Sequence, residues 1–281
     1  YDPIIHPRLI SNASPHMNSL VATAAQARAL EQFGYSNVHA VGLPYIYSDQ
    51  VTTERQPSSL LVMPAHSLPY TDYDIDQKAY VESIAELRPK FSKIIACLHS
   101  SCLEKGYWCQ EFEKWGIPWI TGADVYDKNA LHRMTLIFKS FEYMTTNRLG
   151  SHVAYAAYSG CKVSIYGDYA SPRPEEQRNN PFWKNDPTLL NFWIEKSSYN
   201  AVKKKYPFFF VDPDAASVKT GWGARTVGAD NRRSPVEIAR LLGWSFDKQI
   251  IGYIKVGLRL LCNPRALKQL LYRRRQAKQS H

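Results

Sequence analysis

Short apolar runs alternate with amphipathic stretches through the middle of the chain, between residues 60 and 166. The apolar runs have the length of buried strands, and between them apolar residues recur at helical spacing. Strands that alternate with helices indicate parallel βαβ units, so the pattern predicts an α/β fold with a Rossmann-type, doubly wound parallel sheet. The strands are expected at 60–65, 93–98, 117–121, 143–146 and 162–166, and the helices at 76–87, 103–115, 129–141 and 152–159.

The residues before this alternating block predict a small additional unit. Residues 15–33 carry a rough apolar stripe that predicts a helix ending at Gly34, and residues 37–43 predict a strand that ends at Pro44. Residues 48–59 are polar and show no periodicity, which is typical of a linker between domains.

The residues after the block predict loops and helices. Residues 168–190 are rich in Pro, Asn and charge and predict a long loop, and the Gly-rich residues 220–231 predict another. Helices are expected at 191–206, after the capping signal at 234–237, and within 247–276. The predicted division is a partial N-terminal domain at 1–50, a linker at 51–59, a main domain at 60–245 and basic C-terminal helices at 246–281.

Polar or small residues follow each of the five predicted strands. Because the carboxyl ends of parallel strands meet at one edge of a sheet, where ligands bind, these residues are expected to converge on one crevice. Gly167 and Asp168 follow the last strand. The expected site residues follow the other four, and they are His66 and Ser67, then His99, Ser100 and Ser101, then Gly122 and Asp124, and finally Asn147, Gly150, Ser151 and His152.

The turn between the fourth predicted strand and the small-residue helix after it is suited to a phosphate group. Unpaired backbone N–H groups and the positive end of the helix dipole meet at a helix N-terminus. Gly150 lets a ligand approach the backbone, Ser151 adds a hydroxyl donor, and a protonated His152 could add a charge-assisted hydrogen bond. The alternatives are an ordinary helix cap and a histidine packed on the first helical turn.

The net charge of +10 bears on the partners rather than on the fold. It implies attraction to phosphates, nucleic acid or anionic lipid without choosing among them. The five cysteines have no metal-type spacing and indicate a reduced, cytoplasmic protein, and no apolar run is long enough to cross a bilayer. We interpret the Asp-x-Asp patterns that begin at Asp72 and Asp212 as loop residues, so no metal and no cofactor are predicted.

Segments over about residues 20–245 resemble GT-B glycosyltransferases, in particular those of bacterial surface-polysaccharide assembly. The resemblance implies two facing Rossmann-like domains, with the donor nucleotide on the C-terminal one and the acceptor on the N-terminal one, of which this chain holds only a part. The most specific motif is NRLGSH, at 147–152. It lies within ITGADVYDKNALHRMTLIFKSFEYMTTNRLGSHVAYAAYSGCKVSIYG, and the other segments are AQARALEQFGYSNVHAVGLPYIY and WGARTVGADNRRSPVEIARLLGW.

The function that this resemblance implies is the transfer of a sugar from a nucleotide-sugar donor to a glycan or lipid-linked acceptor. The site residues that follow the predicted strands, other than His66, would bind the donor. His66 is the expected catalytic base and His16 a second choice. Separately, the residues from His66 to Pro69 resemble the His–Pro motif of transferases that use CMP-activated sugars. Two other classes stay open: a sugar-nucleotide epimerase on the same architecture, and a basic nucleic-acid-binding protein, although the basic residues form no recognisable nucleic-acid module.

The C-terminal segment 250–271 mixes apolar with basic residues and leads directly to Arg273, Arg274 and Arg275. A basic amphipathic helix can lie on an anionic membrane surface, which would place this cytoplasmic protein at the inner face of the membrane. The alternative is a terminal helix that packs back across the two domains.

Overall fold

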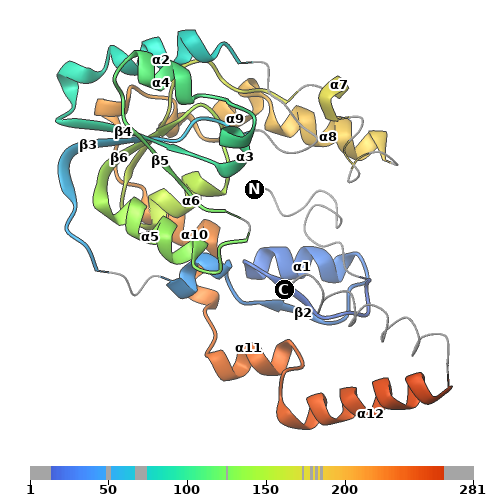
Figure 1. Ribbon diagram of the computed structural model, residues 1–281. Coiled ribbons are helices and arrows are strands. Elements are labelled where there is room, and N and C mark those ends of the chain that lie inside the picture. Colours follow the sequence, from blue (N-terminus) through green and yellow to red (C-terminus); the bar gives the residue numbers. More distant parts are fainter. Residues whose placement is uncertain are drawn as a thin grey trace.

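The computed structural model of the protein describes residues 14–48, 52–66, 75–124, 126–172, 174–177, 180, 183 and 186–262. Its centre is a sheet of five parallel strands in the order β5-β4-β3-β6-β7 (Figure 1). The chain moves from β3 outward to β5, returns to pair β6 with β3, and then moves outward the other way. This is the strand order of a doubly wound Rossmann-type sheet, so the predicted fold class is confirmed. The strands are β3 (Gln56–Val62), β4 (Lys93–Leu98), β5 (Trp119–Thr121), β6 (Phe141–Thr146) and β7 (Lys162–Ile165).

Helices cover both faces of this sheet, because parallel strands buried on both sides present apolar residues to each face. Leu60 on β3 belongs to the core on one face, with Ile84, whereas its neighbour Leu61 belongs to the core on the other, with Phe138. In Figure 1, α2 and α4 lie above the sheet and α5, α6 and α10 lie below it. These helices are α2 (Gln77–Ala85), α4 (Cys109–Lys114), α5 (Ala130–Ser140), α6 (Ser151–Tyr158) and α10 (Thr220–Val227).

The remaining helices are short, apart from α8 and the terminal helix α12. Among the described residues, no helix combines the length and the apolar character that a membrane span requires. The α-helices are α3 (Ser100–Glu104), α7 (Pro174–Gln177), α8 (Pro187–Ser197), α9 (Tyr199–Lys205), α11 (Pro235–Leu241) and α12 (Phe246–Cys262). Single 3₁₀ turns lie at Pro44–Ser48, Arg88–Lys90, Pro207–Phe209, Pro213–Ala215 and Ala229–Asn231.

A second, two-stranded parallel sheet forms from the N-terminal part of the described chain. Its strands β1 (Ser19–Val21) and β2 (Val38–Ala40) pair on either side of α1 (Ala24–Gln32) in the sequence. The helix predicted over 15–33 is therefore wrong in its first half. Thr23 caps α1 and exchanges hydrogen bonds with Gln26, so the helix begins only after Thr23 and the preceding residues pair as a strand.

Three further predictions on 103–115, 220–231 and 51–59 differ from the structure. The single helix predicted over 103–115 is instead divided into α3 and α4 at Trp108. This residue takes a positive φ of 72°, and its indole N–H donates a hydrogen bond to the carbonyl of Ala65 at 3.2 Å. The segment 220–231, predicted as a loop, forms α10, which packs on α6 through Gly223. The segment 51–59, predicted as a linker, overlaps β3, which begins at Gln56.

The C-terminal side also has more helix boundaries than predicted. α8 begins at Pro187, inside the predicted loop over 168–190, because Asp186 caps it. The single helix predicted over 191–206 is two helices, because the side chain of Ser198 caps α9 and ends α8.

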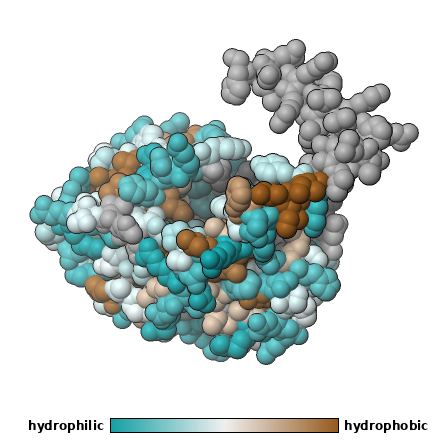
Figure 2. Space-filling model, turned by 90° about the horizontal axis from the view of Figure 1, so that it is seen from below, coloured by the Kyte–Doolittle hydropathy of each residue, from teal (hydrophilic) through white to brown (hydrophobic). Residues whose placement is uncertain are grey.

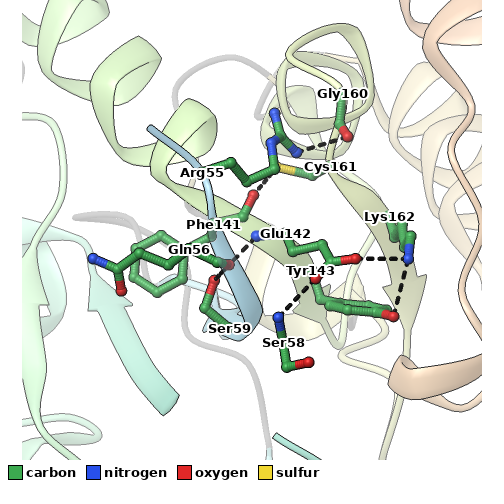
Figure 3. Close-up of polar contacts among 10 residues, drawn as sticks. All are labelled: Arg55, Gln56, Ser58, Ser59, Phe141, Glu142, Tyr143, Gly160, Cys161 and Lys162. Atoms are coloured by element: carbon green, nitrogen blue, oxygen red, sulfur yellow. Dashed lines mark hydrogen bonds and ion pairs between the residues drawn. The ribbon is translucent and has the colours of Figure 1, made fainter. Parts of the chain in front are cut away.

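Polar side chains fix the edge of the sheet at which β6 and β7 begin (Figure 3). Lys162 on β7 donates a hydrogen bond to Glu142 on β6 at 2.7 Å, which holds the pKa of that carboxyl below its usual value. Arg55 donates to the carbonyls of Ser159 and Gly160 at 2.6 and 2.7 Å, and so closes the C-terminus of α6. The N-terminus of α6 therefore lies at the opposite edge, where the strands end.

Candidate functional site

A cavity of about 300 Å³ opens at the carboxyl edge of the sheet, beside the point where β3 and β6 meet. The strand order of a doubly wound sheet reverses at this point, and the loops on either side leave a crevice for a ligand. The walls come from the loops after β3, β4, β5 and β6 and from α5 and α6. Six of the predicted site residues line it: His66, His99, Gly122, Gly150, Ser151 and His152.

The N-terminus of α6 contributes Gly150 and Ser151 to the cavity wall. Gly150 has an extended backbone, with φ −155° and ψ −176°, and no side chain caps the helix there. The close packing of His152 on this turn favours glycine, since a Cβ at this position would lie 2.8 Å from Cε1 and Nδ1 of that ring. An uncapped first turn, with the positive end of the helix dipole behind it, suits an anionic group.

His152 is partly buried beneath this turn, and its Nε2 lies 3.0 Å from the hydroxyl oxygen of Thr146. Burial is the main cause that lowers the pKa of its imidazole to about 3, and the neighbouring His66 and Arg148 lower it further. The lowered pKa disfavours a protonated imidazole near pH 7 and so argues against a charge-assisted hydrogen bond from His152. The neutral ring instead packs on the first turn of α6, which is the alternative considered from the sequence.

His66 and His99 form a pair in the cavity wall, with ring centroids 4.6 Å apart. Nδ1 of His99 accepts a hydrogen bond from the backbone N–H of Ser101 at 3.2 Å, so in the neutral ring the proton is on Nε2. Burial lowers the pKa of both imidazoles, and the proximity of His99 lowers that of His66 further. Both rings are therefore neutral near pH 7, and a neutral imidazole can accept a proton.

Four predicted site residues do not line the cavity, and each has a local structural role. Ser101 holds the ring of His99, with its hydroxyl 2.8 Å from Nδ1. Asp124 accepts a hydrogen bond from the N–H of Tyr126 at 2.7 Å, and this bond and one with the hydroxyl of Ser100 lower the pKa of its carboxyl. Asn147 is fully buried and accepts a hydrogen bond from the N–H of Ala65 at 2.8 Å, which ties the loop after β6 to the loop after β3.

Ser67 lies outside the described residues, as does the Asp-x-Asp pattern at Asp72. His16 is exposed beside β1 and does not line the cavity. In the second Asp-x-Asp pattern, Asp214 pairs with Lys90 at 2.9 Å on the surface. Across the described part of the chain, no three His, Cys, Asp or Glu side chains are grouped closely enough to hold a metal ion.

Arg148 also lines the cavity, although the sequence analysis assigned it no role. Its guanidinium donates a hydrogen bond to the carbonyl of Ala170 at 2.5 Å and lies 5.8 Å from the ring centroid of Trp193 on α8. It is thus a positive group held beside an uncapped helix N-terminus. The signal available in the sequence was the position of Arg148 inside the turn suited to a phosphate.

Comparisons with known proteins identify no family for this chain. No protein-family model and no curated protein matches it. The crystal structure of the pneumococcal O-GlcNAc transferase GtfA in complex with UDP and GlcNAc is similar, with a TM-score of 0.35 and 14% identity over 83% of this chain and 44% of that one. The crystal structure of a GtfA/B complex has a TM-score of 0.36 and 18% identity over 75% of this chain and 42% of that one. The chain thus spans less than half of either relative, and a likeness of this degree assigns no function.

Proposed function

We propose that this protein is a glycosyltransferase of the GT-B type, which takes a sugar from a nucleotide-sugar donor bound in the cavity. The observation that carries the proposal is the composition of the cavity wall. At the reversal point of a Rossmann-type sheet it combines the uncapped N-terminus of α6, the cation Arg148 and the neutral imidazoles of His66 and His99.

The donor diphosphate is the group that this site would recognise most strongly. The first turn of α6 and the hydroxyl of Ser151 would donate hydrogen bonds to phosphate oxygens, and Arg148 would supply a charge-assisted one. The same groups would stabilise the negative charge that develops on the leaving nucleotide as the glycosidic bond breaks.

A glycosyl transfer also needs a base that takes the proton of the acceptor hydroxyl. We assign this role to His66, because its imidazole lines the cavity and its lowered pKa keeps it unprotonated near pH 7. The proposed acceptor is a glycan or a lipid-linked sugar of bacterial surface-polysaccharide assembly, on the cytoplasmic side of the membrane, and the proposed transfer uses no metal.

The experiment that tests this proposal is a thermal-shift panel of CMP, UDP, GDP and dTDP, each compared with its nucleoside and each measured with Mg²⁺ and with EDTA. A ligand that binds only the folded protein at a concentration about a hundredfold above its Kd should raise Tm by about 5–10 °C. The expected result is a shift with one nucleotide, a smaller shift with its nucleoside, and no dependence on Mg²⁺.

Activity is then measured with the sugar nucleotide whose base gives the shift. Release of the free nucleotide only when a glycan acceptor is present would support transfer. Conversion of the bound sugar to its epimer without an acceptor would instead identify the epimerase class. The absence of any nucleotide shift, together with a shift by a DNA duplex, would contradict the proposal.

A further inference from the structure

An exposed apolar face extends over the turn between α11 and α12 and along the first half of α12. The exposed fractions are 64% for Trp244, 80% for Phe246 and 56% for Ile254. Ile250, Ile251 and Tyr253 are exposed as well. Figure 2 views the molecule from below, the side on which α12 lies in Figure 1, and shows apolar side chains gathered on this face. Large apolar side chains that gather on an exposed face often mark a binding site for another apolar body.

Helical spacing places three of the apolar residues of α12 on one side and its two described lysines on another, with Ile251 on the side of the lysines. Phe246, Ile250 and Ile254 recur every four residues and lie along one side of the helix. Lys248 and Lys255 are seven residues apart and lie along another side. Both lysines are exposed. The one acidic residue of the helix, Asp247, lies in its first turn, where the helix dipole favours it.

Nearly all of the net charge of the chain resides in this region of the sequence. Residues 240–281 contain ten Lys and Arg and one Asp, which is +9 of the chain's +10. The rest of the chain is therefore close to neutral. The same segment thus carries both the positive charge and the exposed apolar face. These two properties are complementary to a surface that is both anionic and apolar.

We propose that α12 lies on an anionic lipid surface, with Phe246, Ile250 and Ile254 in the headgroup and acyl boundary and the lysines toward the headgroups. A lipid bilayer fits both properties of the face. A nucleic acid would fit the charge but leave exposed isoleucines without a role, since it is bound through basic and aromatic side chains. The inference is independent of the proposed function, because vesicle binding is measured without any nucleotide.

The test is co-sedimentation of the full chain with phosphatidylcholine vesicles, with and without about 30 mol% phosphatidylglycerol. Binding is expected only to the anionic vesicles. K248Q/K255Q should weaken it roughly 30-fold, because each basic group near the surface contributes roughly fivefold. F246Q/I250Q/I254Q keeps good helix formers and should weaken it by more than about tenfold through the lost apolar burial.

Matched controls remove similar groups elsewhere. K78Q/K128Q removes two exposed lysines outside α12, and F33Q/Y126Q removes two exposed aromatic residues outside the face. Both should bind as the parent does. Trp244 provides an independent readout: brominated lipid should quench its fluorescence, so the quenched fraction should fall in W244F.

Three results would overturn the proposal. The first is that the protein does not bind anionic vesicles, and the second is that F246Q/I250Q/I254Q binds them as well as the parent. The third is that a DNA duplex releases the protein from the vesicles and also binds this triple variant as tightly as the parent. The last result would identify a nucleic-acid surface instead.

Discussion

Replacement of Arg148 by glutamine separates the role of this residue in ligand binding from its role in the fold. The substitution removes a charged donor that contacts the carbonyl of Ala170 at 2.5 Å and a cation 5.8 Å from the ring of Trp193. A hydrogen bond with a charged partner contributes about 1.5–3 kcal/mol and an exposed cation–π contact about 0.5–1 kcal/mol, so we expect a loss of about 2–4 kcal/mol in unfolding free energy. That corresponds to a decrease in Tm of about 4–16 °C.

The effect of R148Q on binding should be selective for the phosphate. If the guanidinium binds the donor diphosphate, its loss should weaken the nucleotide diphosphate about 10- to 150-fold and leave the nucleoside unchanged. Isothermal titration calorimetry of both ligands measures this difference. The affinity of the parent for the diphosphate should also fall with added salt more steeply than that of R148Q.

The control variant is R225Q, which removes the same charge from an exposed position on α10 outside the cavity. It should bind both ligands as the parent does. The reasoning is refuted if R148Q binds the diphosphate within about twofold of the parent, or if diphosphate and nucleoside weaken by the same factor, since the second result would indicate a distorted cavity.

The remaining predictions concern stability. G223A should lower the free energy of unfolding, measured in urea, by about 1–3 kcal/mol. The new Cβ would lie 2.4 Å from the backbone nitrogen of Tyr158 and would force α10 away from α6. An unchanged urea midpoint would contradict this packing. R55A should cost about 1–3 kcal/mol, since it leaves the two carbonyls at the end of α6 without their charged donor, whereas R225A should cost little. The folded pKa of His152, about 3, lies below its unfolded value of 6.5, so its contribution to stability is complete above about pH 6.5 and is lost as the pH falls toward 3. Urea midpoints from pH 7.5 to pH 5 should therefore decrease, and H152Q should decrease less steeply; an equal slope would mean that His152 is not buried in its neutral form.

The alternating part of the fold is predictable because its signals are local. β4 is an apolar run that polar residues follow, and α2 begins just after Asp76, whose side chain caps it. The break at Trp108 is not local, because it depends on an indole that packs against Tyr80 and binds the carbonyl of Ala65. α10 likewise has two glycines that disfavour a helix, and contact with α6 overrides them.

The site shows the same division between local and tertiary causes. The convergence of His66, His99 and Gly150 on one cavity follows from the strand ends alone, because parallel strands share a carboxyl edge. The position of Arg148 could not be derived in this way, since Trp193 holds it from a helix far along the chain. The protonation of His152 also depends on burial, which a linear pattern does not reveal.

The measurement that tests the central claim most directly is a long-range ¹⁵N–¹H spectrum of the imidazoles while the nucleotide diphosphate is added. The histidines of this chain lie both inside and outside the cavity, so each spectrum contains its own control. The account predicts that the resonances of His66, His99 and His152 shift together and saturate with one Kd, while those of His16, His39 and His132 stay in place. Shifts confined to the second group, or no shift at a concentration that raises Tm, would contradict a nucleotide site at this edge of the sheet.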